Sequence, residues 1–277
     1  MSAYYDISTM TSPQFAAALE TASLALLPVG ATEQHGPNLG LGADYRIAEA
    51  IAERVAKRLH PKAVVAPPLP FGVSDQHLGF SGTISISSQT FQQVCLEVVR
   101  SLAHHGLEKF IFVNGHQGNM ATLNVLTSRI LNELGLRAAT VFWMAQAKDA
   151  IERHRKTERW GHACEIETSI AMALCSDLVS EVLEPGDLIE DYGAYEDNYA
   201  AFAVQTPKPF HERTRNGAFG DATQATQEAG EEIVEATVER AAAFAEDFIL
   251  LRQRQGEAVD APRNRLAVEV AQKHGPG

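Results

Sequence analysis

A polar stretch that contains Glu33 and His35, and is followed by Asp44, comes after the apolar run at residues 24–27. That run predicts a short buried strand. In extended backbone, residues two apart point to the same side, so Glu33 and His35 can reach one point while Gln34 turns away. The glycine and proline at 36–37 then break regular structure, and the chain can fold Asp44 back over that point. Carboxylate oxygen and imidazole nitrogen are common ligands of divalent metals, so the stretch indicates a metal site. A solvated polar loop is the alternative.

A second polar cluster, residues 114–119, has the sequence Asn-Gly-His-Gln-Gly-Asn and contains His116. It follows the apolar run at 110–113, which predicts another buried strand. Ligands bind beyond the carboxyl ends of the strands in parallel sheets, and both clusters lie at such ends. We therefore expect the two clusters to face each other.

A third cluster, residues 160–169, contains His162, Glu165 and Glu167 and is predicted to open a helix. On a helix, His162 and Glu165 share a face because they are three residues apart, whereas Glu167 points nearly opposite. Glu165 and Glu167 therefore cannot both serve one site if the segment is a regular helix. Glu167 therefore reads as a structural acid or as a partner of the ligands.

The elements that must position these clusters alternate between short apolar runs and amphipathic stripes. This alternation predicts an α/β fold with a mainly parallel sheet covered on both faces. Strands are expected at residues 24–27, 63–66, 110–113 and 138–143, and helices at 44–59, 88–105, 119–134, 160–174 and 230–252. Residues 185–220 are rich in proline and glycine and predict a long irregular segment, which is either functional or packed on a partner.

Composition limits the classes of function. The 277 residues suffice for one large or two small domains, and the net charge of -12 disfavours nucleic acid and anionic membrane as partners. The three cysteines, Cys95, Cys164 and Cys175, predict free thiols in a reducing compartment. No apolar run approaches the roughly 20 residues of a membrane span, so we expect a soluble cytoplasmic protein.

Taken in order, the three clusters resemble the creatininase (creatinine amidohydrolase) family over roughly residues 20–180. The resemblance implies a three-layer αβα fold, here a single domain over residues 1–252 with a polar tail at 253–277. It also implies two divalent metal ions per chain (zinc, manganese or iron), hydrolysis of a C–N bond in a small cyclic amide or formamide, and a homohexamer.

Carried over by position, the resemblance makes Glu33, Asp44 and His116 ligands of one metal ion, and His35 with the shared Asp44 ligands of the second. Creatininase itself has a further glutamate ligand where this chain has Gly118. Deformylase-like and peptidase-like members also have glycine there and supply a glutamate from the third cluster. Glu165 matches it, which argues against strict creatinine hydrolysis.

Two divalent ions bridged by a carboxylate lower the pKa of a water toward about 7 and so provide hydroxide at neutral pH. That hydroxide attacks a polarised carbonyl, and a general acid must then protonate the leaving nitrogen. His162 has a suitable intrinsic pKa for this role, although it could instead cap a helix or bind metal. The alternatives for the whole protein are a hydrolase of a C–C or lactone bond in a ring ketone, and a non-catalytic metal-binding scaffold.

Overall fold

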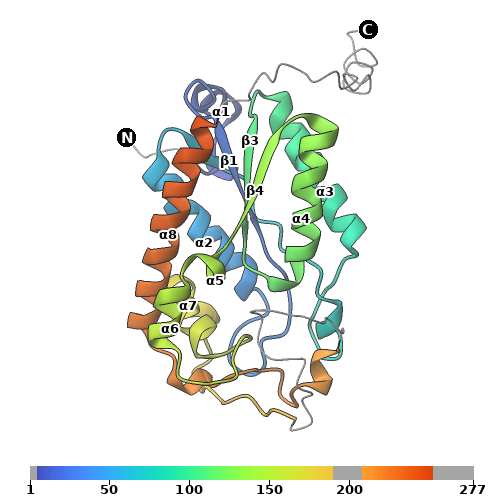
Figure 1. Ribbon diagram of the computed structural model, residues 1–277, viewed down its shortest axis with the longest axis vertical. Coiled ribbons are helices and arrows are strands. Elements are labelled where there is room, and N and C mark those ends of the chain that lie inside the picture. The colour runs from blue at the N-terminus through green and yellow to red at the C-terminus, as the bar shows by residue number, and fades with distance from the viewer. Residues whose placement is uncertain (1–4, 190–207, 252–277) are drawn as a thin grey trace.

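A single parallel sheet organises the computed structural model, which describes residues 5–189 and 208–251 (Figure 1). The strand order within these residues is β2-β1-β3-β4. The strands are β1 (Leu24–Val29), β2 (Ala63–Val65), β3 (Lys109–Asn114) and β4 (Arg137–Phe142). The predicted α/β fold with a parallel sheet is confirmed.

Helices cover both faces of the sheet, as parallel strands joined by crossover helices require (Figure 1). One face carries α2, α7 and α8, and the other carries α3 and α4. The helices are α1 (Ser12–Ala18), α2 (Ala43–Leu59), α3 (Ser88–His104), α4 (Met120–Arg129), α5 (Trp143–Gln146), α6 (Lys148–His154), α7 (Glu165–Leu174) and α8 (Gln227–Leu250).

Strand β1 shows how one short run serves two cores. Leu24 and Leu26 pack against α2 and α8, whereas Ala25 and Leu27 pack against α3 and α4, because successive side chains point to opposite faces. All of its residues are buried, so the run is apolar throughout rather than alternating. This pattern is what made the strand recognisable in the sequence.

Three strands end in register at one edge of the sheet. Val29 pairs with Asn114, and Asn114 pairs with Phe142. The loops that follow β1 and β3 carry the first two polar clusters, so both clusters emerge at the same edge. The expectation that they face each other is confirmed by the ion pairs between Glu33 and His116 and between Asp44 and His116.

The irregular segment predicted after residue 184 is described only in part. Residues 208–221 form a short 3₁₀ turn at Phe210–Glu212 and isolated bridges, one of them between His162 and Phe219. The remainder of that segment, at 190–207, and the predicted tail at 253–277 lie outside the described residues. Among the described helices, none is both long and apolar enough to cross a membrane.

Candidate metal centre

Six buried side chains converge at the carboxyl edge of the sheet. Five of them are site residues that the sequence predicted: Glu33, His35, Asp44, His116 and His162. The sixth is Glu167, which the sequence analysis read as a structural acid or a partner of the ligands. The remaining predicted residue, Glu165, is also buried but has other partners.

Asp44 is in the first turn of α2 and lies between two histidines from other segments. Its Oδ1 is 3.2 Å from His35 Nε2, and its Oδ2 is 3.2 Å from His116 Nδ1. The loop after β3 reaches α2 through Gly115, where a Cβ would lie only 2.0 Å from the Asp44 carbonyl oxygen. Glycine at 115 therefore brings His116 to Asp44.

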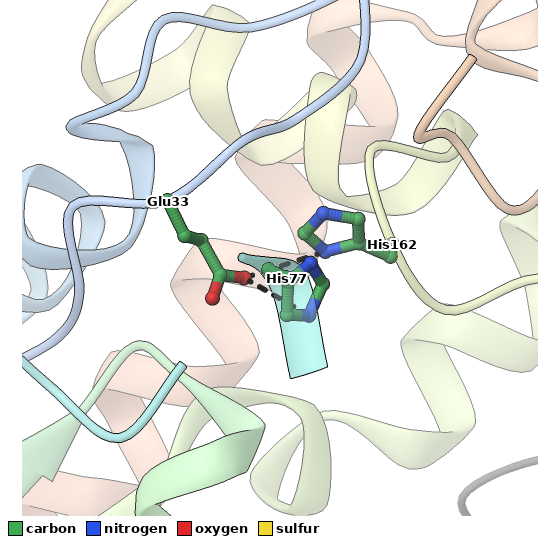
Figure 2. Close-up of side chains that lie close together, drawn as sticks. All are labelled: Glu33, His77 and His162. Carbon is green, nitrogen blue, oxygen red and sulfur yellow. Dashed lines mark ion pairs between the residues drawn. The ribbon is translucent and has the colours of Figure 1, made fainter. Parts of the chain in front are cut away.

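The Glu33 carboxylate faces three imidazoles. Its Oε1 is 3.4 Å from His116 Nδ1 and 3.7 Å from both His77 Nε2 and His162 Nδ1. Figure 2 shows this oxygen directed at the rings of His77 and His162. His77 comes from the loop before α3, so four separate loops meet at Glu33.

Three of these histidines share one hydrogen-bonding arrangement. His35 Nδ1 lies 3.1 Å from the Glu33 carbonyl, His116 Nε2 3.0 Å from the Val73 carbonyl, and His162 Nε2 2.7 Å from the Gln34 carbonyl. A carbonyl only accepts, so in each ring that nitrogen carries the proton. The other nitrogen is left with a lone pair directed at carboxylates, as in histidines that bind metal.

Glu165 has a complete set of neutral hydrogen-bond donors. Its Oε1 accepts from Lys156 N at 3.1 Å, Thr157 N at 2.9 Å and Thr157 Oγ1 at 2.7 Å, and its Oε2 accepts from Asp221 N at 3.2 Å. Glu167 Oε2 accepts from Ala163 N at 2.6 Å and lies 3.7 Å from His35 Nε2. The structure thus directs Glu167, rather than Glu165, into the cluster.

The helix that was expected to join His162 to Glu165 does not include His162. Helix α7 begins at Glu165, and His162 is in extended backbone paired with Phe219. Ala163 between them has φ +47°, a left-handed conformation that costs a residue other than glycine roughly 1–2 kcal/mol. The assumption of a common helix face was therefore wrong, and the turn at Ala163 brings His162 and Glu167 within 3.9 Å.

The surroundings of His77 were not predicted from the sequence. Gln34, expected to turn away, is buried with its Nε2 2.9 Å from His77 Nδ1 and 3.1 Å from the Gly217 carbonyl. Phe210 stacks on the His77 ring at 4.4 Å and 23°. These contacts join segments far apart in the chain, and no local pattern signals them.

The pKa values of these groups reflect the balance between burial and neighbouring charge. Burial lowers the pKa of His35, but Asp44 and Glu167 outweigh it, and the result lies well above the usual value. The pKa of His116 is raised in the same way, with Glu33 and Asp44 outweighing burial. Burial raises the pKa of Asp44, but His35 and His116 hold it below its usual range.

His77 and His162 shift in the opposite direction. Burial, together with the neighbouring His116 and His35, puts the pKa of His77 well below its usual value. Burial lowers the pKa of His162 to about 4, and the neighbouring His35 and His77 contribute in the same direction. Both rings are therefore neutral near pH 7.

The cluster fits divalent metal ions on its own chemistry. Three buried atoms that face its interior have no hydrogen-bond partner: Glu33 Oε2, His35 Nε2 and Asp44 Oδ2. Burying such groups without partners is costly unless a cation satisfies them. The ligand atoms of Glu33, His35 and Asp44 lie within 4.8 Å of one another, as do those of His35, His162 and Glu167. Glu33, Asp44, His162 and Glu167 border a cavity of about 20 Å³.

Position 118, where the resemblance to creatininase would place a glutamate, has no room for a side chain. A Cβ on it would lie 2.3 Å from both His116 Nε2 and the Val73 carbonyl oxygen. These two atoms form the hydrogen bond that orients His116. The absence of a side chain at residue 118 thus leaves room for the hydrogen bond that orients His116.

Comparisons with known proteins identify the family. The family described as "Creatininase: Creatinine amidohydrolase" matches residues 8–245. A mycofactocin precursor peptide peptidase of Mycobacterium ulcerans is 34% identical over 181 residues, a match that spans 63% of this chain and 66% of that relative's own length. A creatinine amidohydrolase of Pseudomonas putida is 30% identical over 244 residues, which span 80% of this chain and 89% of the relative.

A solved structure of a creatininase variant in its zinc–zinc form shares the fold. It superposes with a TM-score of 0.73 at 27% identity and covers 88% of this chain and 98% of its own. The family match over most of the chain, the common fold and the buried carboxylate–histidine clusters agree with one another. The chain belongs to the creatininase family of metal-dependent hydrolases.

Proposed function

We propose that this chain hydrolyses the C–N bond of a small polar amide with two divalent metal ions. The carrying observation is the cluster of buried carboxylate and imidazole ligand atoms described above, three of which have no hydrogen-bond partner, so that protons or metal ions must lie between them. Glu33, Asp44 and His116 would hold one ion, and Asp44, His35 and Glu167 the other. Glu167 replaces the predicted Glu165, whose oxygens are already occupied by backbone and hydroxyl donors.

When bound, the two ions would polarise the substrate carbonyl and lower the pKa of a water so that it becomes a nucleophile. The water oxygen adds to the carbonyl carbon and ends in the carboxylate product. The C–N bond breaks, and the leaving nitrogen takes a proton. The chain's own residues must therefore remove one proton from the water and deliver one to the nitrogen.

His162 is placed to move that proton. Its Nε2 donates to the Gln34 carbonyl, which leaves Nδ1 free beside Glu33 and Glu167. The ring is neutral near pH 7, so it first accepts a proton at Nδ1 and then gives it to the leaving nitrogen. His162 thus keeps the general-acid role that was predicted from the sequence. The alternative is that its Nδ1 binds a metal ion.

The relatives support more than one substrate. A creatinine amidohydrolase acts on a cyclic amide by its name, and a peptide peptidase cleaves peptide bonds by its name. A cyclic amide or formamide was expected from the sequence, and the peptidase relative adds short peptides as candidates. Hydrolysis of a C–C or lactone bond in a ring ketone remains the alternative reaction.

Metal analysis and turnover together test the proposal. Purified protein is expected to hold about two divalent ions per chain, zinc, manganese or iron, and to hydrolyse at least one member of a panel of cyclic amides, formamides, short peptides and ring lactones. Asp44→Ala should lose both ions because each Asp44 oxygen faces a different histidine. Retention of both ions by this variant would contradict the shared-ligand assignment.

The assembly and location of the protein stay predictions. The family resemblance implies a homohexamer, which light scattering of the purified protein would test. The family resemblance implies a small-molecule substrate, and the net charge of -12 disfavours nucleic acid and anionic membrane as partners of a protein expected in the cytoplasm.

A further inference from the structure

His77 differs from the other buried histidines of the site, and Gln34 is the reason. The Gln34 Oε1 accepts from Gly36 N at 2.9 Å, which fixes the orientation of the amide. Its Nε2 is therefore the donor, and it has three neighbours: His77 Nδ1 at 2.9 Å, the Gly217 carbonyl at 3.1 Å and His162 Nε2 at 3.1 Å.

The two amide hydrogens can serve only two of these neighbours. His162 Nε2 already donates to the Gln34 carbonyl at 2.7 Å, so it carries a proton and cannot accept another hydrogen bond. The amide hydrogens then go to the Gly217 carbonyl and to His77 Nδ1. His77 Nδ1 is consequently an acceptor, and the proton of the neutral ring is on Nε2.

The Nε2–H of His77 points toward the site. It lies 3.7 Å from Glu33 Oε1 and 3.4 Å from the amide nitrogen of Gln76, a half-buried side chain whose oxygen can take that place by rotation of the amide. Stacking on Phe210 holds the ring in this orientation. His35, His116 and His162 present lone pairs to the cluster, whereas His77 presents a hydrogen.

We propose that His77 is a catalytic residue whose Nε2–H holds the carbonyl oxygen of the scissile amide. This inference rests on the proposed function. As the water oxygen bonds to the carbonyl carbon, the π-electron pair moves onto the carbonyl oxygen, and the hydrogen bond from Nε2 strengthens. The pair returns when the C–N bond breaks, and the proton stays on His77 throughout. One preorganised donor of this kind contributes about 10²- to 10³-fold to kcat.

The same arrangement argues against His77 as a metal ligand. Glu33, His77 and His162 lie close enough to hold an ion (Figure 2). A metal bond from Nε2 would require a lone pair there and a proton on Nδ1, which would then meet the fixed Gln34 amide donor. Two donors would face each other at 2.9 Å.

Nitrogen-15 NMR of the histidine-labelled, zinc-loaded full chain tests the tautomer without any turnover. We expect the His77 resonances to show a neutral ring with its proton on Nε2. Gln34→Glu should reverse this by offering an acceptor to Nδ1. A proton on Nδ1 in the unmodified protein, or an Nε2 shifted by bonded zinc, would overturn the proposal.

Two substitutions test the role in catalysis. His77→Phe keeps the ring that stacks on Phe210 but removes the donor, and it should lower kcat by roughly 10²- to 10³-fold with KM and metal content nearly unchanged. His77→Gln restores an amide donor of similar reach and should recover part of the loss. Lost metal or an unchanged kcat in His77→Phe would refute the role. An unmodified protein that is inactive on every amide counts against the proposed function instead, and NMR still decides the tautomer.

Discussion

Two glutamates only two positions apart, Glu165 and Glu167, occupy contrasting surroundings. Both are buried at the start of α7. Glu165 accepts four hydrogen bonds from backbone amides and a hydroxyl, and these tie together residues 156–157, α7 and Asp221. Glu167 accepts one backbone hydrogen bond and otherwise faces His35 and His162.

The difference separates a carboxylate that supports the fold from one that can bind a ligand. A carboxylate with a full set of hydrogen-bond donors is stable as it stands, because its charge is shared among them. A carboxylate that faces basic lone pairs requires a proton or a metal ion between them. Both residues are glutamates in the first turn of the same helix, so their surroundings and not their residue type decide their roles.

The sharpest way to break the comparison is to neutralise each glutamate in turn. Glu167→Gln should lose one of the two metal ions and nearly all turnover, because an amide is a poor ligand beside His35. Glu165→Gln should keep both ions and lower the free energy of unfolding by about 1–3 kcal/mol, since its amide hydrogens meet backbone donors. Metal analysis and denaturant titration measure the two effects, and an exchange of the two outcomes would contradict the assignment.

The next largest effect is expected from the neighbour of Glu167. His162→Asn should reduce kcat by roughly 10²- to 10⁴-fold and retain both ions, because it removes a proton carrier and not a ligand. Substrates with good leaving groups should lose less than those with poor ones, since they need less protonation. Loss of an ion, or equal losses on both kinds of substrate, would show that His162 is a ligand or a positioning residue.

A substitution at Gly118 tests how much the hydrogen bond that orients His116 contributes to metal binding. Gly118→Ala places a Cβ against the hydrogen bond between His116 and the Val73 carbonyl. We expect zinc affinity to fall about 10- to 100-fold, the usual cost of disturbing an outer partner of a metal ligand. Gly106→Ala is a suitable control because no atom lies within 4 Å of its Cβ position, although its φ of +100° adds strain. Isothermal titration with zinc compares the two variants, and equal affinities would refute the effect.

The last effect concerns pH and needs no substitution. The raised pKa values of His35 and His116 mean that protons occupy their lone pairs in the metal-free protein below those pKa values. Zinc must displace these protons, so its affinity should rise by up to about tenfold per displaced proton for each pH unit until those pKa values are passed.

Without metal, the same shifts stabilise the fold at low pH. The contribution is complete below the ordinary histidine value of 6.5 and is lost as pH rises through the raised pKa values. Melting temperatures of the metal-free protein should therefore fall across that interval, and those of the zinc-loaded protein should not. Parallel curves for the two forms would contradict this account.

Much of the fold was predictable because it depends on local patterns. The apolar runs and four-residue stripes locate the strands and α2, α3 and α8 closely, and the first two clusters follow strand ends. The choice between Glu165 and Glu167 was not predictable from helix geometry, because it depends on the left-handed turn at Ala163 and on donors from residues 156–157 and 221. The role of Gln34 depends on Gly217, which lies 183 residues away.

That last contact has a consequence for the order of events during synthesis. Glu33, His35 and Asp44 leave the ribosome early, whereas the segment that pairs with His162 and accepts from Gln34 is made 183 residues later. At about 5–20 residues per second, the delay is roughly 10 to 40 s. The proposed ligands are all made by residue 167, but the contacts that orient Gln34 and His162 cannot form on the nascent chain during that time. We expect metal that binds before release to meet a site whose ligands are present and whose Gln34 and His162 are not yet held in place.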